Sequence, residues 1–278
     1  MTSMASREEL VSYIQSKLSS NITELKNNFQ NSISEIGIRY CYLDDLLPEK
    51  IAKKIYSVFP KKNEMRFMDN FREKRYASKS FDQFDPILKD ITFAIQDDRI
   101  VRIVEKITGI VEQMPDPTLY AGGLSLMGKG NFLNPHIDNS HEMSRTKYRI
   151  LNLLYYVSPG WSLERGGNLE LWDKKVKRRV TIESKFNRLT IMETNPWSWH
   201  SVSPVAVDEN RNCVSNYYFS QKSPIGKDYF NVTSFNAPPE QYLKRIISNI
   251  DNRLRNFIRF VKPAGFAKKD IYIQNNEN

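Results

Sequence analysis

The feature that most constrains this chain is a pair of metal-ligating side chains two positions apart, His136 and Asp138, with a third candidate ligand, His200, far downstream. On an extended strand, residues i and i+2 point to the same face, so this imidazole and carboxylate would project together. With His200 added, two imidazoles and one carboxylate can occupy one face of an octahedral ion. The chain has only three histidines. The remaining one, His141, lies in a polar loop, and we expect it at the surface.

This ligand set is the facial triad of non-haem Fe(II) oxygenases, which leaves three coordination positions open for a co-substrate and O2. Such a pattern is common by chance, but its context here is specific. Four segments after the first pair have the apolar or alternating character of strands: Leu151–Val157, Asn168–Trp172, Phe186–Met192 and Asn212–Phe219. On the last of them, Arg211, Ser215 and Phe219 share one strand face, so Arg211 can point toward the metal.

At these residues the chain resembles the Fe(II)- and 2-oxoglutarate-dependent dioxygenases, in particular their prolyl 4-hydroxylase-like branch. The resemblance covers about residues 84 to 222, and Asp116–Gly123 is similar to the lead-in of bacterial members. The matching motifs are His136-x-Asp138-Asn139, Leu154-Tyr155-Tyr156-Val157 with Trp161, Gly166-Gly167-x-Leu169, Phe186-Asn187-Arg188-Leu189, His200-x-Val202-x-Pro204 and Arg211-x-x-x-Ser215.

The resemblance implies a site in which His136, Asp138 and His200 bind Fe(II), with 2-oxoglutarate and O2 as co-substrates. Arg211 would hold the distal carboxylate of 2-oxoglutarate, since a guanidinium can donate two parallel hydrogen bonds to a carboxylate. By their positions in the motifs, Tyr156 and Ser215 would donate hydroxyl hydrogen bonds to the same carboxylate. The expected reaction is hydroxylation of an unactivated C–H bond of a small metabolite or biosynthetic intermediate, with decarboxylation of 2-oxoglutarate to succinate.

Other substrates, reactions and classes of protein are alternatives to this one. The alternative substrate is a prolyl or other residue of a protein or peptide. Asp138 argues against halogenation, because halogenating relatives have a small residue there, whereas desaturation and ring closure stay open. Nucleic-acid demethylases of the superfamily have paired arginines where this chain has only Arg211, and a cupin-type metal site would need a His-x-His motif. A metal-binding barrel without turnover is the non-enzymatic alternative. Where prolyl hydroxylases often have a further tyrosine before the metal motif, the matching position here is Leu126.

Composition fits an ordinary globular chain, with 40% hydrophobic and 26% charged residues among 278. No apolar run approaches the roughly 18 residues of a membrane span, and Met1–Arg7 lacks a signal peptide's apolar segment. We expect Cys41 and Cys213 to be free thiols and the protein to be cytoplasmic. The net charge is +9, but no run of five or six like charges occurs, so no nucleic-acid partner is expected.

The two ends of the chain are predicted to be helical. Ser6 and Glu9 form a capping box for one amphipathic helix of about five turns running to Phe29. A strand follows at Gly37–Leu43, then a helix capped by Asp45 and ended by Pro60. Residues 61–83 show no clear period, and a lid over the barrel mouth and an irregular surface loop are equally favoured. Two helices are expected at residues 86–96 and 98–108, the second ended by Gly109.

A long basic amphipathic helix is expected after Pro239, ended by Pro263 and followed by a frayed tail from Lys268. Its apolar stripe comprises Leu243, Ile247, Ile250, Leu254, Phe257 and Val261. We expect this stripe to cover the barrel flank or a dimer partner; peripheral contact with an anionic membrane is the less favoured alternative.

The predicted fold class is mainly β with flanking helices (α+β): a double-stranded β-helix, or jelly-roll, with N- and C-terminal helices packed on it. The whole chain, residues 1–278, is interpreted as a single domain. It divides into a helical and lid region (1–117), the barrel core (118–222) and a helical extension (223–278).

Overall fold

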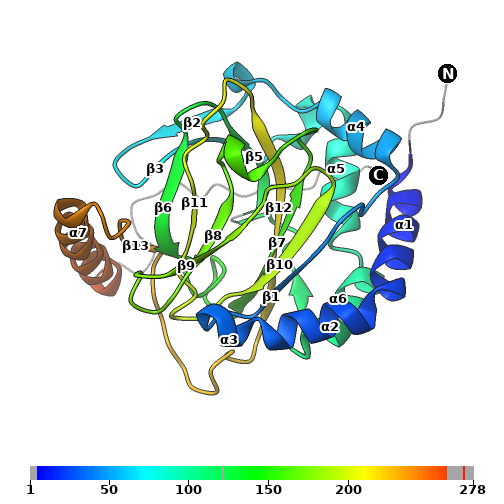
Figure 1. Cartoon of the computed structure of the whole chain (residues 1–278). Helices are drawn as coiled ribbons and strands as arrows, with labels where there is room; N and C mark the ends of the chain where they lie inside the picture. Colours follow the sequence, from blue (N-terminus) through cyan, green and yellow to red (C-terminus); the bar gives the residue numbers. More distant parts are fainter. Residues whose placement is uncertain (1–4, 121, 262–271, 273–278) are drawn as a thin grey trace.

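An antiparallel sheet rolled into a barrel forms the centre of the computed structural model, which describes residues 5–120, 122–261 and 272 (Figure 1). Thirteen strands among these residues belong to the sheet, and its main path runs β1-β10-β7-β12-β5-β3-β6-β11-β8-β9. Strands β13, β2 and β4 pair with β6, β3 and β12 respectively. This is the double-stranded β-helix architecture that the sequence predicts.

The strands of the barrel proper agree with the expected segments to within a few residues. Strand β7 is almost wholly buried, which explains why its sequence is nearly continuously apolar. The strands are β1 (Tyr40–Leu43), β2 (Arg66–Asp69), β3 (Glu73–Ser78), β4 (Met114–Pro115), β5 (Gly123–Met127), β6 (Phe132–Ile137), β7 (Tyr148–Tyr156), β8 (Leu169–Trp172), β9 (Arg179–Ile182), β10 (Arg188–Glu193), β11 (His200–Val202), β12 (Arg211–Ser220) and β13 (Ser234–Phe235).

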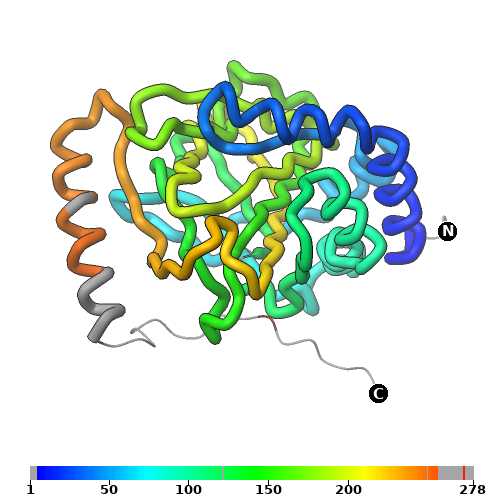
Figure 2. The backbone as a smooth tube through the Cα atoms, turned by 90° about the horizontal axis from the view of Figure 1, so that it is seen from below, coloured from blue at the N-terminus to red at the C-terminus, as the bar shows by residue number. Residues whose placement is uncertain are grey.

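Helices α1, α2, α5 and α6 pack together against one side of the sheet (Figures 1 and 2). Their apolar faces and the outer face of β7 and β12 form the main hydrophobic core. The helices are α1 (Arg7–Ser20), α2 (Ile22–Asn31), α3 (Ile33–Ile36), α4 (Glu49–Ser57), α5 (Pro86–Ala94), α6 (Asp98–Thr108) and α7 (Tyr242–Val261), with short 3-10 turns at Lys62–Glu64, Phe81–Gln83 and Leu163–Arg165.

Helix starts and stops follow local chemistry in most places. The capping box is confirmed: the Glu9 amide donates to the Ser6 hydroxyl and the Ser6 amide to the Glu9 carboxylate. Gly109 ends α6 with a φ of 69°, a left-handed conformation that glycine adopts without strain. The single five-turn helix is wrong, because the chain breaks at Asn21, whose side chain donates to the Lys17 carbonyl.

The cap predicted for α4 is also wrong. Asp45 has a φ of 54° and lies outside the helix, which begins after Pro48. Asn187 explains the late start, because its side chain accepts from the Leu47 amide and donates to the Leu47 carbonyl. These two bonds hold the chain out of helical conformation until Pro48.

Residues 61–83 are not an irregular surface loop, whereas a lid over the barrel mouth stays a prediction. Strands β2 and β3 make a hairpin, and β3 is inserted in the sheet between β5 and β6. Arg66, Met68 and Arg75 of this hairpin line the central cavity. The inward face of the hairpin is polar because it faces this cavity, so the sequence lacks the apolar alternation that marks most strands.

Helix α7 lies beside the barrel, on the side away from α1 and α2 (Figures 1 and 2). Among the described residues, no helix is long and apolar enough to cross a membrane. The side chains of Phe257 and Val261, Pro263 and the tail from Lys268 other than Tyr272 lie outside what the structure describes, so those expectations stay predictions. Tyr272 is buried against the Phe81 and Phe93 rings, so at this residue the expectation of a frayed tail is wrong.

Candidate active site

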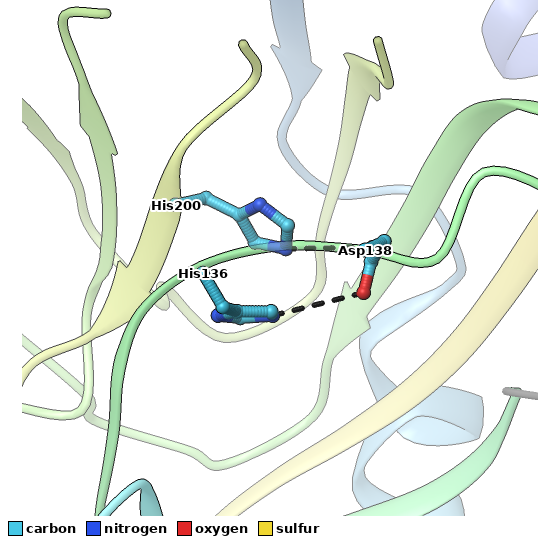
Figure 3. Close-up of side chains that lie close together, drawn as sticks. All are labelled: His136, Asp138 and His200. Carbon is cyan, nitrogen blue, oxygen red and sulfur yellow. Dashed lines mark ion pairs between the residues drawn. The ribbon is translucent and has the colours of Figure 1, made fainter. Parts of the chain in front are cut away.

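His136, Asp138 and His200 meet inside the barrel, as their spacing predicts (Figure 3). His136 is on β6, Asp138 directly follows that strand, and His200 begins β11 and pairs with His136 across the sheet. The Nε2 atoms of His136 and His200 lie 3.7 and 3.6 Å from the Asp138 carboxylate oxygens. One donor atom from each residue falls within 4.8 Å of the others, a spacing that suits one shared ion.

Both imidazoles are held in the form that binds a metal. Each Nδ1 lies 3.0 Å from a backbone carbonyl oxygen, that of Asn134 for His136 and that of Ser198 for His200. Since a carbonyl only accepts, the proton is on Nδ1 and the Nε2 lone pair is directed at the ion position. Burial, together with the neighbouring His200, lowers the pKa of His136 to about 3, so this ring is neutral at physiological pH.

Two neighbours on β7 keep the Asp138 carboxylate ionised. The Asn152 amide donates to it at 2.9 Å, and the guanidinium of Arg149 lies 3.1 Å away. Burial acts to raise the pKa of Asp138, but the charge of Arg149 outweighs it and holds the pKa well below its usual range. The carboxylate is therefore ready to bind a cation at any physiological pH.

The triad and Arg211 line one cavity of about 580 Å³. Arg211 begins β12 and is 3% exposed. Its side chain lies over the Tyr156 ring, 4.7 Å from the ring centroid, and its Nε is 3.4 Å from the Ser184 hydroxyl. Among the described residues, no carboxylate pairs with it. A buried guanidinium without an anion is costly, so the geometry favours an anionic ligand at this position.

Three other arginines near the motifs have carboxylate partners and are weaker candidates. Arg149 pairs with Asp138, Arg165 with Glu209 and Arg188 with Asp44. Of these four arginines, Arg211 is thus the one whose charge a bound acid would neutralise.

Of the two predicted hydroxyl donors, Tyr156 lies against Arg211, and Ser215 is further along the same strand as Arg211. The Tyr156 hydroxyl is buried without a hydrogen-bond partner among the described residues. Ser215 lines the cavity, two residues beyond Cys213 on the same face of β12. Gly167 lies against the aliphatic part of Arg211, where a side chain would crowd both the arginine and Val205.

One sequence-based expectation around the site is wrong. His141 is buried rather than at the surface, because its ring packs 4.2 Å from that of Tyr148 and near Phe230, which folds back over it. Leu126 belongs to the apolar core, whereas its neighbours Ser125 and Met127 line the cavity. The side of β5 with Ser125 and Met127 therefore lines the cavity, and Leu126, which matches the position of the further tyrosine of prolyl hydroxylases, does not.

The sequence interpretation missed several residues that shape the site. Arg149 and Asn152 hold Asp138, and the Phe235 ring stacks 5.4 Å from that of His136. A charged residue within the apolar β7 segment was the available signal for Arg149, since an arginine is rarely buried unpaired. Phe235 carried no such signal.

The rolled antiparallel sheet and the buried His–Asp–His cluster define the class: a non-haem iron oxygenase of the double-stranded β-helix type. Residues 122–219, which include the triad and Arg211, match the model of the 2OG-Fe(II) oxygenase superfamily. This match agrees with the family that the motifs predict and supports a 2-oxoglutarate-dependent iron dioxygenase. The family implies Fe(II), 2-oxoglutarate and O2, and the two imidazoles and the ionised carboxylate found here suit a divalent iron.

Solved structures with a similar fold include two prolyl hydroxylases. One is a prolyl hydroxylase from Trichoplax adhaerens in complex with a hypoxia inducible factor peptide fragment: 18% identity, TM-score 0.51, covering 73% of this chain and 92% of that one. The other, a prolyl 4-hydroxylase from Phytophthora capsici, has 14% identity and a TM-score of 0.51 over 91% of this chain and 80% of its own. At this identity the likeness concerns the fold. No curated protein matches the sequence.

Proposed function

We propose that the protein hydroxylates an unactivated C–H bond of a small metabolite or biosynthetic intermediate, with His136, Asp138 and His200 as the iron ligands. When bound, Fe(II) supplies the centre at which O2 is reduced while 2-oxoglutarate loses CO2 and becomes succinate. The protein's own residues bind the co-substrate, orient it and keep bulk water out of the cavity.

The observation that carries this proposal is the buried Arg211 without a carboxylate partner, in the same cavity as the triad. A dicarboxylic acid that binds the metal through one end would present its other carboxylate to this guanidinium. The Tyr156 and Ser215 hydroxyls would then donate hydrogen bonds to that carboxylate, which would satisfy the Tyr156 hydroxyl.

A small substrate is favoured by the shape of the site. A cavity of about 580 Å³ is in the size range of small-molecule sites, and 2-oxoglutarate would occupy part of it. The β2–β3 hairpin is hydrogen-bonded into the sheet and forms one wall, which narrows the access that a folded protein segment would need. Hydroxylation of a prolyl or other residue in a peptide is the second candidate, in line with the fold of the two prolyl hydroxylases.

Titration of 2-oxoglutarate into the anaerobic Fe(II) protein, followed by the visible charge-transfer band, tests the role of Arg211. Arg211→Ala should leave Fe(II) affinity unchanged and weaken 2-oxoglutarate binding by roughly two to three orders of magnitude, since losing one partner of a buried charge pair costs about 3–5 kcal/mol. Arg211→Lys should restore only part of the 2-oxoglutarate affinity, because the single charge of an ammonium group cannot replace the two parallel hydrogen bonds of a guanidinium. Arg165→Ala is the matched control, since that arginine pairs with Glu209 outside the cavity.

Equal 2-oxoglutarate affinity in Arg211→Ala and the wild-type protein would refute this assignment. The reaction itself is tested by succinate release with a panel of metabolites and proline-containing peptides, with Asp138→Ala as the inactive control. Turnover by Asp138→Ala would refute the triad, and turnover with peptides alone would replace the small-molecule proposal by the second candidate.

A further inference from the structure

Helix α7 is mounted on the barrel by its polar side. Asp251 forms an ion pair with Arg72 of the β2–β3 loop. Asn252 accepts a hydrogen bond from the Phe235 amide and donates one to the Phe235 carbonyl, and so joins the helix to β13. These contacts fix the orientation of α7 and leave its opposite side facing outward (Figure 2).

The outward side carries the apolar stripe, contrary to the expectation that the stripe covers the barrel flank. Five large aliphatic side chains at helical spacing are between 42% and 74% exposed: Leu243, Ile246, Ile247, Ile250 and Leu254. Tyr242 adjoins them and is 70% exposed. Single exposed apolar residues are ordinary, but a contiguous stripe over three helical turns indicates a surface with a binding partner.

The charges beside the stripe are basic. Lys244 and Arg253 are exposed at its two edges. Asp251, the acidic residue of the helix, is turned inward to Arg72. The outward side of α7 is therefore apolar along its middle and positive at its margins, which suits an anionic surface. It does not suit a second copy of the chain, because pairing two such helices would bring like charges together.

We propose that the outward face of α7 docks this enzyme onto an anionic membrane, with the helix lying in the plane of the interface. The five aliphatic side chains enter the boundary between headgroups and acyl chains, while Lys244 and Arg253 contact lipid phosphates. A helix with this distribution lies on a bilayer rather than across it. Arg255 of the same helix lines the central cavity, so docking would place the cavity mouth close to the membrane surface.

Sedimentation of the full chain with vesicles tests this inference. We expect binding to phosphatidylcholine vesicles that contain about a quarter phosphatidylglycerol, and much weaker binding to phosphatidylcholine alone or at high salt. The double variant Ile247→Asp/Ile250→Asp should reduce the partition coefficient by roughly a hundredfold or more, since two buried aliphatic side chains are lost. Lys244→Glu/Arg253→Glu should reduce it by at least roughly fivefold for each charge.

Val111→Asp is the matched control, because Val111 is 60% exposed and lies far from α7 in the sequence, after α6. It should bind vesicles as the wild type does. Circular dichroism and Fe(II) binding verify that each variant is folded. Absence of binding to the anionic vesicles would overturn the proposal, as would binding that the Ile247→Asp/Ile250→Asp variant retains. A dimer by light scattering that this variant dissociates would also overturn it and assign the face to a second copy.

Discussion

The guanidinium of Arg149 lies 3.1 Å from the Asp138 carboxylate and 4.3 Å from the centroid of the Tyr217 ring. Arg149 is 1% exposed, so a full positive charge is buried beside the metal position. Burial of the Arg149 guanidinium costs desolvation energy, and the ion pair with the Asp138 carboxylate offsets this cost. Arg149 therefore sets the charge and the orientation of Asp138 rather than holding a co-substrate.

Arg149→Met should weaken metal binding. The methionine fills much of the space of the arginine, but of the two partners on β7 Asp138 then keeps only Asn152. Loss of such a supporting contact typically costs about 10–100-fold in metal affinity. Calorimetric titration of Mn(II) into the anaerobic protein measures the change, with Arg165→Met as control. Unchanged affinity in Arg149→Met would show that Asp138 is positioned without it.

Tyr156→Phe should separate co-substrate binding from folding. The hydroxyl has no partner among the described residues, so its removal should leave the thermal midpoint of the protein without co-substrate unchanged or slightly raised. With 2-oxoglutarate present, the loss of one hydrogen bond to a charged group should raise the apparent KM about tenfold or more. A lower midpoint with an unchanged KM would mean that the hydroxyl serves the fold alone.

The two cysteines should be unreactive in the native protein. Both are free and buried, and burial raises the pKa of the Cys41 thiol to about 12 and that of Cys213 above its usual value. Only about one Cys41 in ten thousand is then a thiolate at pH 8. A thiol reagent should modify both cysteines in denaturant without prior reduction. A pair protected until reduced would contradict the predicted free thiols.

The raised pKa of Cys41 should make the stability of the fold depend on pH in the alkaline range. A thiol whose folded pKa is raised above its unfolded value stabilises the fold fully below the unfolded pKa, near 8.5, and this contribution falls as the pH rises toward 12. The free energy of unfolding should therefore decrease between about pH 9 and 11. Cys41→Ser should not reproduce this decrease to the same extent, because serine does not titrate in that range.

Asn187→Ala should destabilise the fold by about 3 kcal/mol or more. The Asn187 side chain makes hydrogen bonds to both backbone groups of Leu47 and accepts one from the Tyr155 hydroxyl, all of them buried. Its φ of 62° adds strain for alanine, which lacks asparagine's tolerance of that region. Urea unfolding measures the loss, and Asn28→Ala, at an exposed position of α2, is the control and should change little.

Local sequence determined the candidate metal ligands and the ends of most elements. His136 and Asp138 stand together because adjacent pleats of one extended segment place them there, and Ser6 and Gly109 act on the residues next to them. The strand segments from Leu151 to Phe219 could be predicted because they are buried in the barrel, where the apolar pattern of a strand is strongest. These effects act over a few residues, so a single sequence is enough to predict them.

Only the tertiary structure decided the pairings between distant segments. The β2–β3 hairpin enters the sheet between β5 and β6 although its sequence lacks a strand period, because its inward face lines a polar cavity. Arg149 meets Asp138 although β7 and β6 are not neighbours in the sheet. Phe235 meets His136 because β13 pairs with β6, and no local pattern encodes either contact. Tertiary contacts also set the direction of the apolar stripe on α7. The sequence shows that the helix has an apolar and a polar face, but the contacts of Asp251 and Asn252 determine that the polar face lies against the barrel.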